Sequence, residues 1–445
     1  MSEEGGGIQT VDWRRSCTFL EILRSFRMAI HPANLLLCFL GLVVSFALAV
    51  AVDEAFETNV DGASLLQHVH RIATTTLWGE WALPYVGGKT SDDFLTFLMA
   101  PAAAAREAGE LAAAYWQEEP GAAVIITLLS LAVWAVAGGA VTRMAAVRVA
   151  REESVPLKSA LGFSLRKWPS TVTSPLIPFG VLVFMAIIMG ALTGLPGMIP
   201  YVGEFYMGIF LGLSLLMGVV LALIFIGGAF SVGLQWPTIA AEGSDSFDAI
   251  SRSISYISSR PWRYLFLTVF SVLYGCATFI LVKFLSFLTL RLTHEAVSTF
   301  TMGVGGAEDK LLRLWSLPEL AAPWPEMAAL EAPEYAEGAA AYLFAFWVWV
   351  VLGVMMAFLA SFFFCSQTVI YFLLRKGVDA TDIEEVYMEE SEEEELPVEQ
   401  PAEDADAGET GPESEDESPP AEPPAEEDGA DDGGEAEQEE EKGDE

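Results

Sequence analysis

Six long apolar runs limit what this chain can fold into. Each is close to the length that a helix needs to cross a bilayer, and they cover about residues 33–52, 121–142, 172–194, 207–235, 264–290 and 340–374. Inside hydrocarbon every backbone N–H and C=O group must find a partner within the protein, which favours helices. The runs therefore predict an all-α integral membrane protein with six transmembrane helices and interfacial amphipathic helices.

The charge of the chain is concentrated in its last part. The net charge is −38, but residues 379–445 hold 32 Asp and Glu and one lysine, a net of −31. Subtracting −31 from −38 leaves −7 for the first 378 residues. Residues 377–445 contain too few apolar side chains to bury, so they predict a disordered acidic tail. That tail either binds a protein partner or only solvates the chain, and its acidity argues against a nucleic-acid partner.

A short charged segment, residues 236–263, separates the fourth and fifth runs and is called the elbow below. Ser244, Asp245 or Ser246 can cap a helix start, and Pro261 ends that helix at or before Arg260. Helical spacing predicts one apolar face made of Phe247, Ile250, Ile254 and Ile257. The elbow is therefore predicted to be an amphipathic helix on the membrane surface. It is either a mechanical connector, the favoured interpretation, or a regulatory or partner-binding helix.

The N-terminal residues 1–32 are predicted to hold a second interfacial helix. Between residues 12 and 30, aromatic and aliphatic side chains alternate with four arginines, and His31 and Pro32 then break the pattern. Such a basic amphipathic helix suits the cytoplasmic leaflet, whose lipids are anionic.

The loop charges predict the orientation. Residues 143–171 carry six Lys and Arg, and the elbow adds three arginines. Residues 54–120 carry three Lys and Arg against ten acids, and residues 293–339 carry two against eight. The positive-inside rule then places both termini in the cytoplasm and leaves 53–120 and 291–339 as outer loops.

Two glycine pairs predict which helices pack together. Gly190 and Gly194 end the third run, while Gly208 and Gly212 open the fourth after a short turn. Glycines four apart let helix backbones approach closely, although glycine is also common in membrane helices by chance. Residues 150–168 follow the same pattern as the elbow, which hints at two copies of one helix–elbow–helix unit.

No catalytic or metal-binding pattern emerges from the sequence. His68 and His70 could hold a metal only with further ligands, and polar surface is the better interpretation. The four cysteines, Cys17 among them, are predicted to be isolated and mostly core residues. Lys283, inside the fifth run, is predicted to extend to the membrane boundary rather than to form a transport site. We therefore expect no enzyme activity, no cofactor and no metal.

One motif resembles a known family. The motif consists of Glu242-Gly243, then Ala249-Ile250 after five residues, Arg252-Ser253 after one more, and finally Trp262-Arg263. It is similar to a motif of uncharacterised bacterial multi-pass membrane proteins. These are named after the membrane domain of glycerophosphodiester phosphodiesterases. The catalytic His-Arg-Gly motif is missing, since His70-Arg71 is followed by Ile72. The resemblance therefore implies a membrane fold and a functional elbow, and no activity.

The function predicted from these patterns is that of a non-enzymatic inner-membrane component. We expect its elbow and acidic tail to bind lipid or protein partners beyond the bilayer itself. The alternative is a permease for an uncharged or lipidic substrate, which the possible repeat and the glycine-lined helices suggest. The scarcity of charged groups inside the spans argues against a coupled transporter, though not against a passive or lipid-handling one. An intramembrane enzyme is the least favoured hypothesis.

Overall fold

The computed structural model describes residues 18–78, 98–301, 311–312, 314–318, 335–382 and 384–388. Residues 1–17 and 389–445 lie outside the described residues, and with them most of the predicted disordered tail. Every named element in the described part is a helix. In chain order these are η1 (Thr18–Leu23), α2 (Arg24–Ala29), α3 (Pro32–Phe56), α4 (Leu65–Arg71), η2 (Ile72–Trp78), α6 (Ala100–Glu118), α7 (Pro120–Arg151), α8 (Leu157–Met189), η3 (Gly190–Gly194), α9 (Leu195–Gly197), α10 (Val202–Glu242), α11 (Ser246–Ser259), α12 (Pro261–Thr301) and α14 (Tyr335–Val378).

Six helical stretches among the described residues are long and apolar enough to cross a membrane, which confirms the predicted class and number of spans. They are Pro32–Phe56, Pro120–Arg151, Leu157–Gly197, Val202–Glu242, Pro261–Phe300 and Ala339–Val378. Most are longer than predicted, because the helices continue past the apolar runs into polar sequence. The protein is therefore an all-helical, multi-pass membrane protein.

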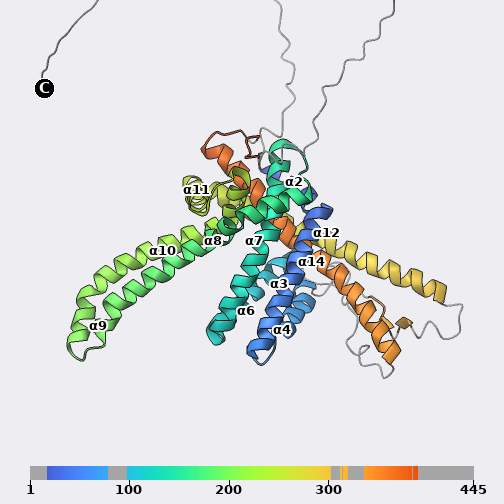
Figure 1. Cartoon of the computed structure of the whole chain (residues 1–445), viewed down its shortest axis with the longest axis horizontal. Coiled ribbons are helices and arrows are strands. Elements are labelled where there is room, and N and C mark those ends of the chain that lie inside the picture. The colour runs from blue at the N-terminus through green and yellow to red at the C-terminus, as the bar shows by residue number, and fades with distance from the viewer. Residues whose placement is uncertain are drawn as a thin grey trace, which may run out of the picture. The chain divides into compact units, whose positions relative to one another are not determined.

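The centre of the bundle is made by α3, α7 and α14, which pack on one another, with α12 against α14 and α8 against α7 (Figure 1). Glycines allow the close approaches. A Cβ on Gly138 would lie 2.5 Å from the ring of Phe364, and one on Gly353 would lie 2.7 Å from the ring of Phe39. Large aromatic side chains on one helix thus fill the space left by glycine on another.

The helices α8 and α10 form an antiparallel pair joined by η3 and α9, as the short turn predicted (Figure 1). The four predicted packing glycines do not make this contact, since a Cβ on Gly190, Gly194, Gly208 or Gly212 would meet no atom within 4 Å. That prediction is wrong. The backbones approach instead at the turn itself, where a Cβ on Gly203 would lie 2.5 Å from the Gly197 carbonyl oxygen.

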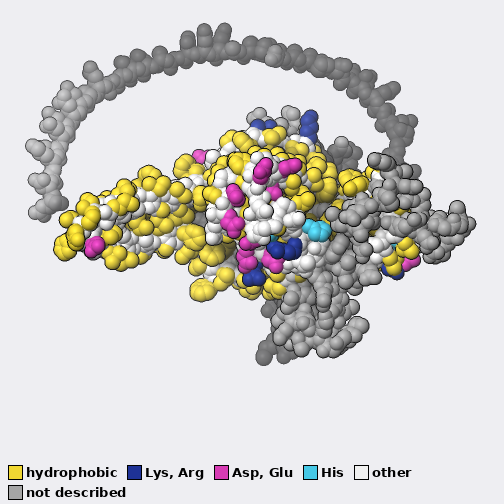
Figure 2. Space-filling model, turned by 90° about the horizontal axis from the view of Figure 1, so that it is seen from below, with side chains coloured by type: hydrophobic (Ala, Val, Ile, Leu, Met, Phe, Trp, Pro, Cys, Tyr) yellow, Lys and Arg dark blue, Asp and Glu magenta, His cyan; other side chains and the backbone are white. Residues whose placement is uncertain are grey.

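The α8–α10 pair presents its apolar residues to the surroundings. None of the most apolar 18-residue stretch of α10 is buried, against 33% for α7. Figure 2 shows hydrophobic side chains over the visible face of this pair. A hydroxyl contact of 2.6 Å between Thr193 and Ser214 satisfies both groups across the pair. Because these side chains stay exposed in a membrane-spanning helix, lipid is their natural environment.

The described parts of the predicted outer loop 53–120, residues 53–78 and 98–120, run back along the bundle. At one end of α3 the Leu65 amide donates to Asp53 Oδ2 at 3.0 Å, and Tyr115 Oη, near the end of α6, donates to Asp53 Oδ1 at 2.7 Å. At the other end of this segment the Lys283 ammonium donates to the Leu77 carbonyl oxygen at 3.3 Å. Between these points α4 packs on α3 and η2, and α6 packs on η2, α7 and α12. The described part of this segment therefore folds back on the bundle, and we call it the re-entrant segment.

The N-terminal segment is less of a surface helix than predicted. The described part is a short 3-10 turn, η1, followed by α2. Phe19 packs edge-on against Phe270 at 5.3 Å, and Phe26 against Phe358 at 5.9 Å. Its apolar side chains thus contact α12 and α14 instead of lying in lipid alone. His31 caps α3 in extended conformation, with Pro32 at the first helical position, as the break at this site predicted.

The proposed repeat of the elbow is not seen in the described residues. α7 ends at Arg151, and α8 begins at Leu157 and continues to Met189 through three prolines. The segment 150–168 therefore contributes one turn and the start of a long helix. The true elbow, in contrast, contains the separate helix α11.

Candidate functional site

The elbow is built by three local signals. α10 ends at Glu242, and Gly243 follows with a φ of 64°, the left-handed conformation that glycine adopts without strain. The Asp245 carboxylate then accepts from the Asp248 amide at 2.9 Å and caps α11, which confirms one of the three predicted caps. Arg260 ends α11 and Pro261 begins α12, as predicted. We call this side of the bundle the elbow end.

The buried side of α11 is made of small and polar residues, not of the predicted apolar face. Ser246, Ala249, Ser253 and Tyr256 are the buried ones, while Phe247 is 71% exposed. The Ser253 hydroxyl lies 3.3 Å from that of Thr238 on α10. Small side chains here let α11 lie directly on α10. The predicted apolar side chains therefore flank this contact, with Phe247 turned outward.

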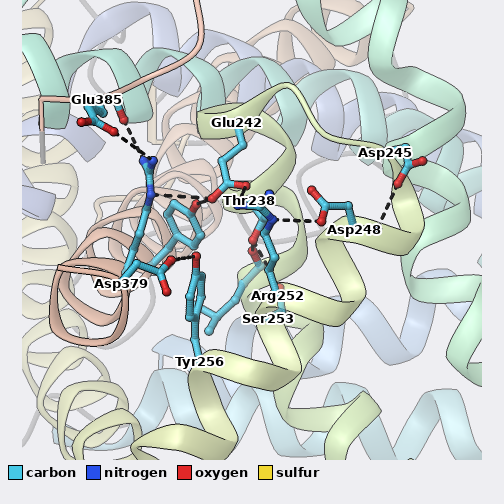
Figure 3. Close-up of polar contacts among 12 residues, drawn as sticks. Thr238, Glu242, Asp245, Asp248, Arg252, Ser253, Tyr256, Asp379 and Glu385 are labelled. Atoms are coloured by element: carbon cyan, nitrogen blue, oxygen red, sulfur yellow. Dashed lines mark hydrogen bonds and ion pairs between the residues drawn. The ribbon is translucent and has the colours of Figure 1, made fainter. Parts of the chain in front are cut away.

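Glu242 is the centre of the cluster shown in Figure 3. Its Oε2 lies 2.7 Å from Arg252 Nη1 on α11, and its Oε1 lies 3.7 Å from Arg375 Nε on α14. The Tyr371 hydroxyl donates a third contact to the same carboxylate. Only 9% of this side chain is exposed, so its charge must be paired. Glu242 thus holds the ends of three helices together.

Arg252 is shared between two carboxylates. Its Nε donates to Asp248 Oδ1 at 2.9 Å, one turn earlier on α11, while its Nη1 faces Glu242. The hydrogen bond to Asp248 raises the pKa of the guanidinium most, burial opposes that shift, and Glu242 adds to it. Arg252 is therefore a permanent cation at the elbow.

The start of the predicted tail is docked on this cluster. We call residues 384–388 the tail root. The Tyr387 amide donates to the Ala241 carbonyl oxygen at 2.8 Å, and Arg375 Nη1 donates to the Glu385 carbonyl oxygen at 2.7 Å. Just before it, Asp379 Oδ2 accepts from Tyr256 Oη at 2.6 Å. Burial and then this hydrogen bond raise the pKa of Tyr256, which keeps the phenol a neutral donor.

Arg143 is the group that the sequence analysis missed. It is fully buried at the elbow end of α7, where one nitrogen donates to the Ala240 carbonyl oxygen at 2.6 Å and another to the Tyr387 carbonyl oxygen at 2.7 Å. Its guanidinium carbon also lies 4.4 Å from the ring centre of Phe163, a cation–π distance. Arg143 therefore joins the tail root to α10 and α8.

Not all residues of the predicted motif meet in the cluster. Glu242, Ala249, Arg252 and Ser253 do. Trp262 is 81% exposed, on the surface beyond the end of α11. Arg263 lies over the end of α14, where a Cβ on Gly377 would come within 2.6 Å of its guanidinium. Trp262 thus has the exposure that an interfacial anchor needs, and Arg263 has a structural contact instead.

The two histidines of the re-entrant segment, His68 and His70, do not face one another. Arg71 can only donate, so His68 Nδ1 accepts from it at 2.9 Å and His68 Nε2 donates to the Val60 carbonyl oxygen at 2.9 Å. The His70 ring turns to Trp349, with ring centres 5.8 Å apart. Within the described part of the chain no three His, Cys, Asp or Glu side chains form a metal site.

The position of the Lys283 side chain also differs from the predicted one. It is 2% exposed and contacts the re-entrant segment, so it does not extend to the membrane boundary. Its ammonium is instead held by the Leu77 carbonyl oxygen at the end of η2. Cys38, Cys276 and Cys365 are buried and free, as small core residues should be.

The cluster can bind and position groups, but its charges are largely paired. A pocket of about 520 Å³ beside it is lined by both signs of charge, with Arg151, Arg252 and Arg375 facing Glu242, Glu384 and Glu385. Such mixed lining favours neither a free anion nor a free cation. Comparison with known protein families, with curated proteins and with solved structures found no match.

Proposed function

We propose that this protein is a non-enzymatic component of the cytoplasmic membrane of a bacterial cell, in which the elbow and acidic tail bind lipid or protein partners. The observation that carries the proposal is the docked tail root. A chain segment that only solvated the protein would need no fixed start, yet Arg143 and Arg375 hold its backbone to three helices. The 57 residues that follow, 389–445, are thus joined to a segment that is held on the bundle.

The charge distribution supports cytoplasmic termini. Lysines and arginines gather at the elbow end, in α7, α8, α11 and α14. The opposite end carries exposed carboxylates, among them Glu54, Glu57, Asp61 and Glu118, and Figure 2 shows acidic side chains on that side. By the positive-inside rule the elbow and both termini then face the cytoplasm. The resemblance of the Glu242–Arg263 motif to bacterial membrane proteins is compatible with this orientation.

The test is to purify three forms in a mild detergent and identify what accompanies them by native mass spectrometry. The forms are the full chain, a chain that ends at residue 388, and Arg106→Gln as a control. Arg106 is exposed on α6, where it pairs with Glu110 in an i,i+4 contact of 3.3 Å. A protein partner should be retained by the control and lost with residues 389–445. An unchanged set of copurifying proteins in the shortened chain would contradict the proposal.

A permease for an uncharged or lipidic substrate is the second candidate. The glycine faces and the repeat that motivated it are not observed, but an apolar groove between α3, η2 and α14 supports it. Flux of such a substrate into proteoliposomes, reduced by a bulky residue in that groove, would favour this candidate. No flux with any substrate class tested would leave the membrane component as the better account.

A further inference from the structure

An apolar groove lies on the side of the bundle where the re-entrant segment meets α3 and α14. Its volume is about 520 Å³. Phe39 and Phe46 of α3 form one wall, Ala73 and Leu77 of η2 the second, and Met355 with its neighbours on α14 the third. Among the lining side chains only His70, Thr74 and the indole N–H of Trp349 offer polar groups, and Thr74 already donates to the His70 carbonyl oxygen at 2.7 Å.

The groove lies at a depth that lipid occupies. Its α3 wall runs from Phe39 to Phe46, near the middle of a helix that extends from Pro32 to Phe56. Its α14 wall lies within the stretch Ala339–Val378, which is also long and apolar enough to cross a membrane. The wall made by α4 and η2 is anchored to α3 where the Leu65 amide donates to Asp53 Oδ2. A ligand therefore reaches the groove through the hydrocarbon layer rather than from water.

The rim of the groove continues into surface that faces lipid. Val43 on α3 is 47% exposed and Phe346 on α14 is 56% exposed, although both also line the groove. An acyl chain can thus pass from the surrounding layer into the groove without crossing polar protein. A peptide segment is a poorer occupant, because its N–H and C=O groups would meet almost no partners on these walls.

We propose that this groove binds one acyl chain of a membrane lipid. Within a bilayer no hydrophobic transfer energy drives a chain from lipid into protein, so the stabilisation must come from close contacts. The groove supplies them on three sides, whereas the exposed surface of α10 supplies them on one. This site does not depend on the tail, and it holds whether or not the tail has a partner.

The test is photolabelling in vesicles of phosphatidylethanolamine and phosphatidylglycerol that contain a trace of phosphatidylethanolamine with a diazirine on one acyl chain. Peptide mass spectrometry then compares labelling at Val43, Met355 and Met356 with labelling at Leu215 and Leu216. The last two are each 64% exposed on α10 and report ordinary boundary lipid. We expect the groove residues to take up about tenfold more label per residue, as a preference of about 1.4 kcal/mol would give.

Two variants test the shape of the groove. Ala73→Phe fills it from η2 and should reduce labelling at Met355 and Met356 to the level of α10. Ala47→Phe is the matched control, since Ala47 is exposed on α3 and does not line the groove. If Ala73→Phe does not purify as a folded protein, Val43→Trp at the exposed rim replaces it.

Equal labelling of the groove and of α10 would overturn the proposal, because the chains there would be ordinary boundary lipid. Weaker labelling in the groove would overturn it too, since another part of the chain or a second copy would then fill the space. Labelling that survives in the chain ending at residue 388 would support the groove even if no partner of the tail is found. The two proposals can thus fail separately.

Discussion

Gly243 should decide whether the tail root stays docked. This residue has a φ of 64°, and a Cβ placed on it would lie 2.7 Å from the Tyr387 ring. Gly243→Ala therefore imposes two penalties at once. One is the strain of a left-handed alanine, and the other is a contact that forces the ring of Tyr387 to move.

The size of the effect follows from these contacts. A left-handed residue other than glycine costs about 1–2 kcal/mol. Moving Tyr387 also weakens the hydrogen bond that its amide donates to the Ala241 carbonyl oxygen, worth about 0.5–1.5 kcal/mol. It weakens as well the hydrogen bond that Arg143 donates to the Tyr387 carbonyl oxygen, worth about 1.5–3 kcal/mol because the donor is charged. A loss of about 1.4 kcal/mol in docking already means tenfold more undocked tail root.

Hydrogen exchange measured by mass spectrometry is the suitable assay, because the Tyr387 amide is protected only while the root is docked. In Gly243→Ala we expect exchange of residues 384–388 to be at least about tenfold faster than in the unchanged protein. Gly62→Ala is the matched control. Gly62 has a φ of 76°, but a Cβ there would meet nothing within 4 Å. It should lower stability through backbone strain alone and leave the tail root protected.

Removing the ring separates the two penalties. In a Tyr387→Ala background the contact is absent, so adding Gly243→Ala should cost only the backbone strain. The reasoning would be refuted if Gly243→Ala left the exchange of residues 384–388 unchanged. It would equally be refuted if Gly62→Ala accelerated that exchange as much as Gly243→Ala did.

Three further substitutions test the packing. Arg143→Met keeps the bulk but leaves the Ala240 and Tyr387 carbonyl oxygens without their charged donor, which should lower the free energy of unfolding in detergent by about 3–5 kcal/mol; a loss below about 1 kcal/mol would contradict the assigned role. Ser253→Leu should lower the free energy of unfolding by about 1–3 kcal/mol, because the larger side chain forces α11 off α10. Hydrogen exchange across α11 should then be faster, whereas Phe247→Leu on the exposed side should leave it unchanged. Tyr115→Phe removes a donor to Asp53 and should cost about 1–2 kcal/mol, seen as faster exchange in α4 if the re-entrant segment is anchored there.

The spans could be predicted because the signal for them is local. Twenty or so apolar residues in a row have no other stable environment than a bilayer or a large core. The helix ends were predicted less well, because residues such as Arg143 and Trp236 continue a helix that packing stabilises. Packing between distant parts of the chain also explains why the re-entrant segment was not predicted. Nothing in residues 65–78 alone indicates that Asp53 and Lys283 will hold its two ends beside α3.

The elbow was predicted in part for similar reasons. Asp245 and Pro261 act on their immediate neighbours, so the start and end of α11 could be predicted. Which face α11 buries depends on the small side chains that α10 can accept, and a pattern of apolar residues does not contain that information. The tail root was missed because its partners Arg143 and Arg375 lie on other helices, and composition alone predicts a solvated segment there.

The pairing at the elbow gives the tail a mechanical connection to the bundle. Arg375 contacts the tail root through Glu385 and contacts α10 through Glu242, so the same side chain serves both. Arg143 makes the equivalent connection from α7, between Ala240 and Tyr387. Any partner that draws the tail root away must therefore leave two guanidinium groups short of an acceptor. Arg375 would then pair more closely with Glu242, which also holds Arg252 and α11. We therefore expect undocking of the tail root to change the charge pairs that hold α11 on α10.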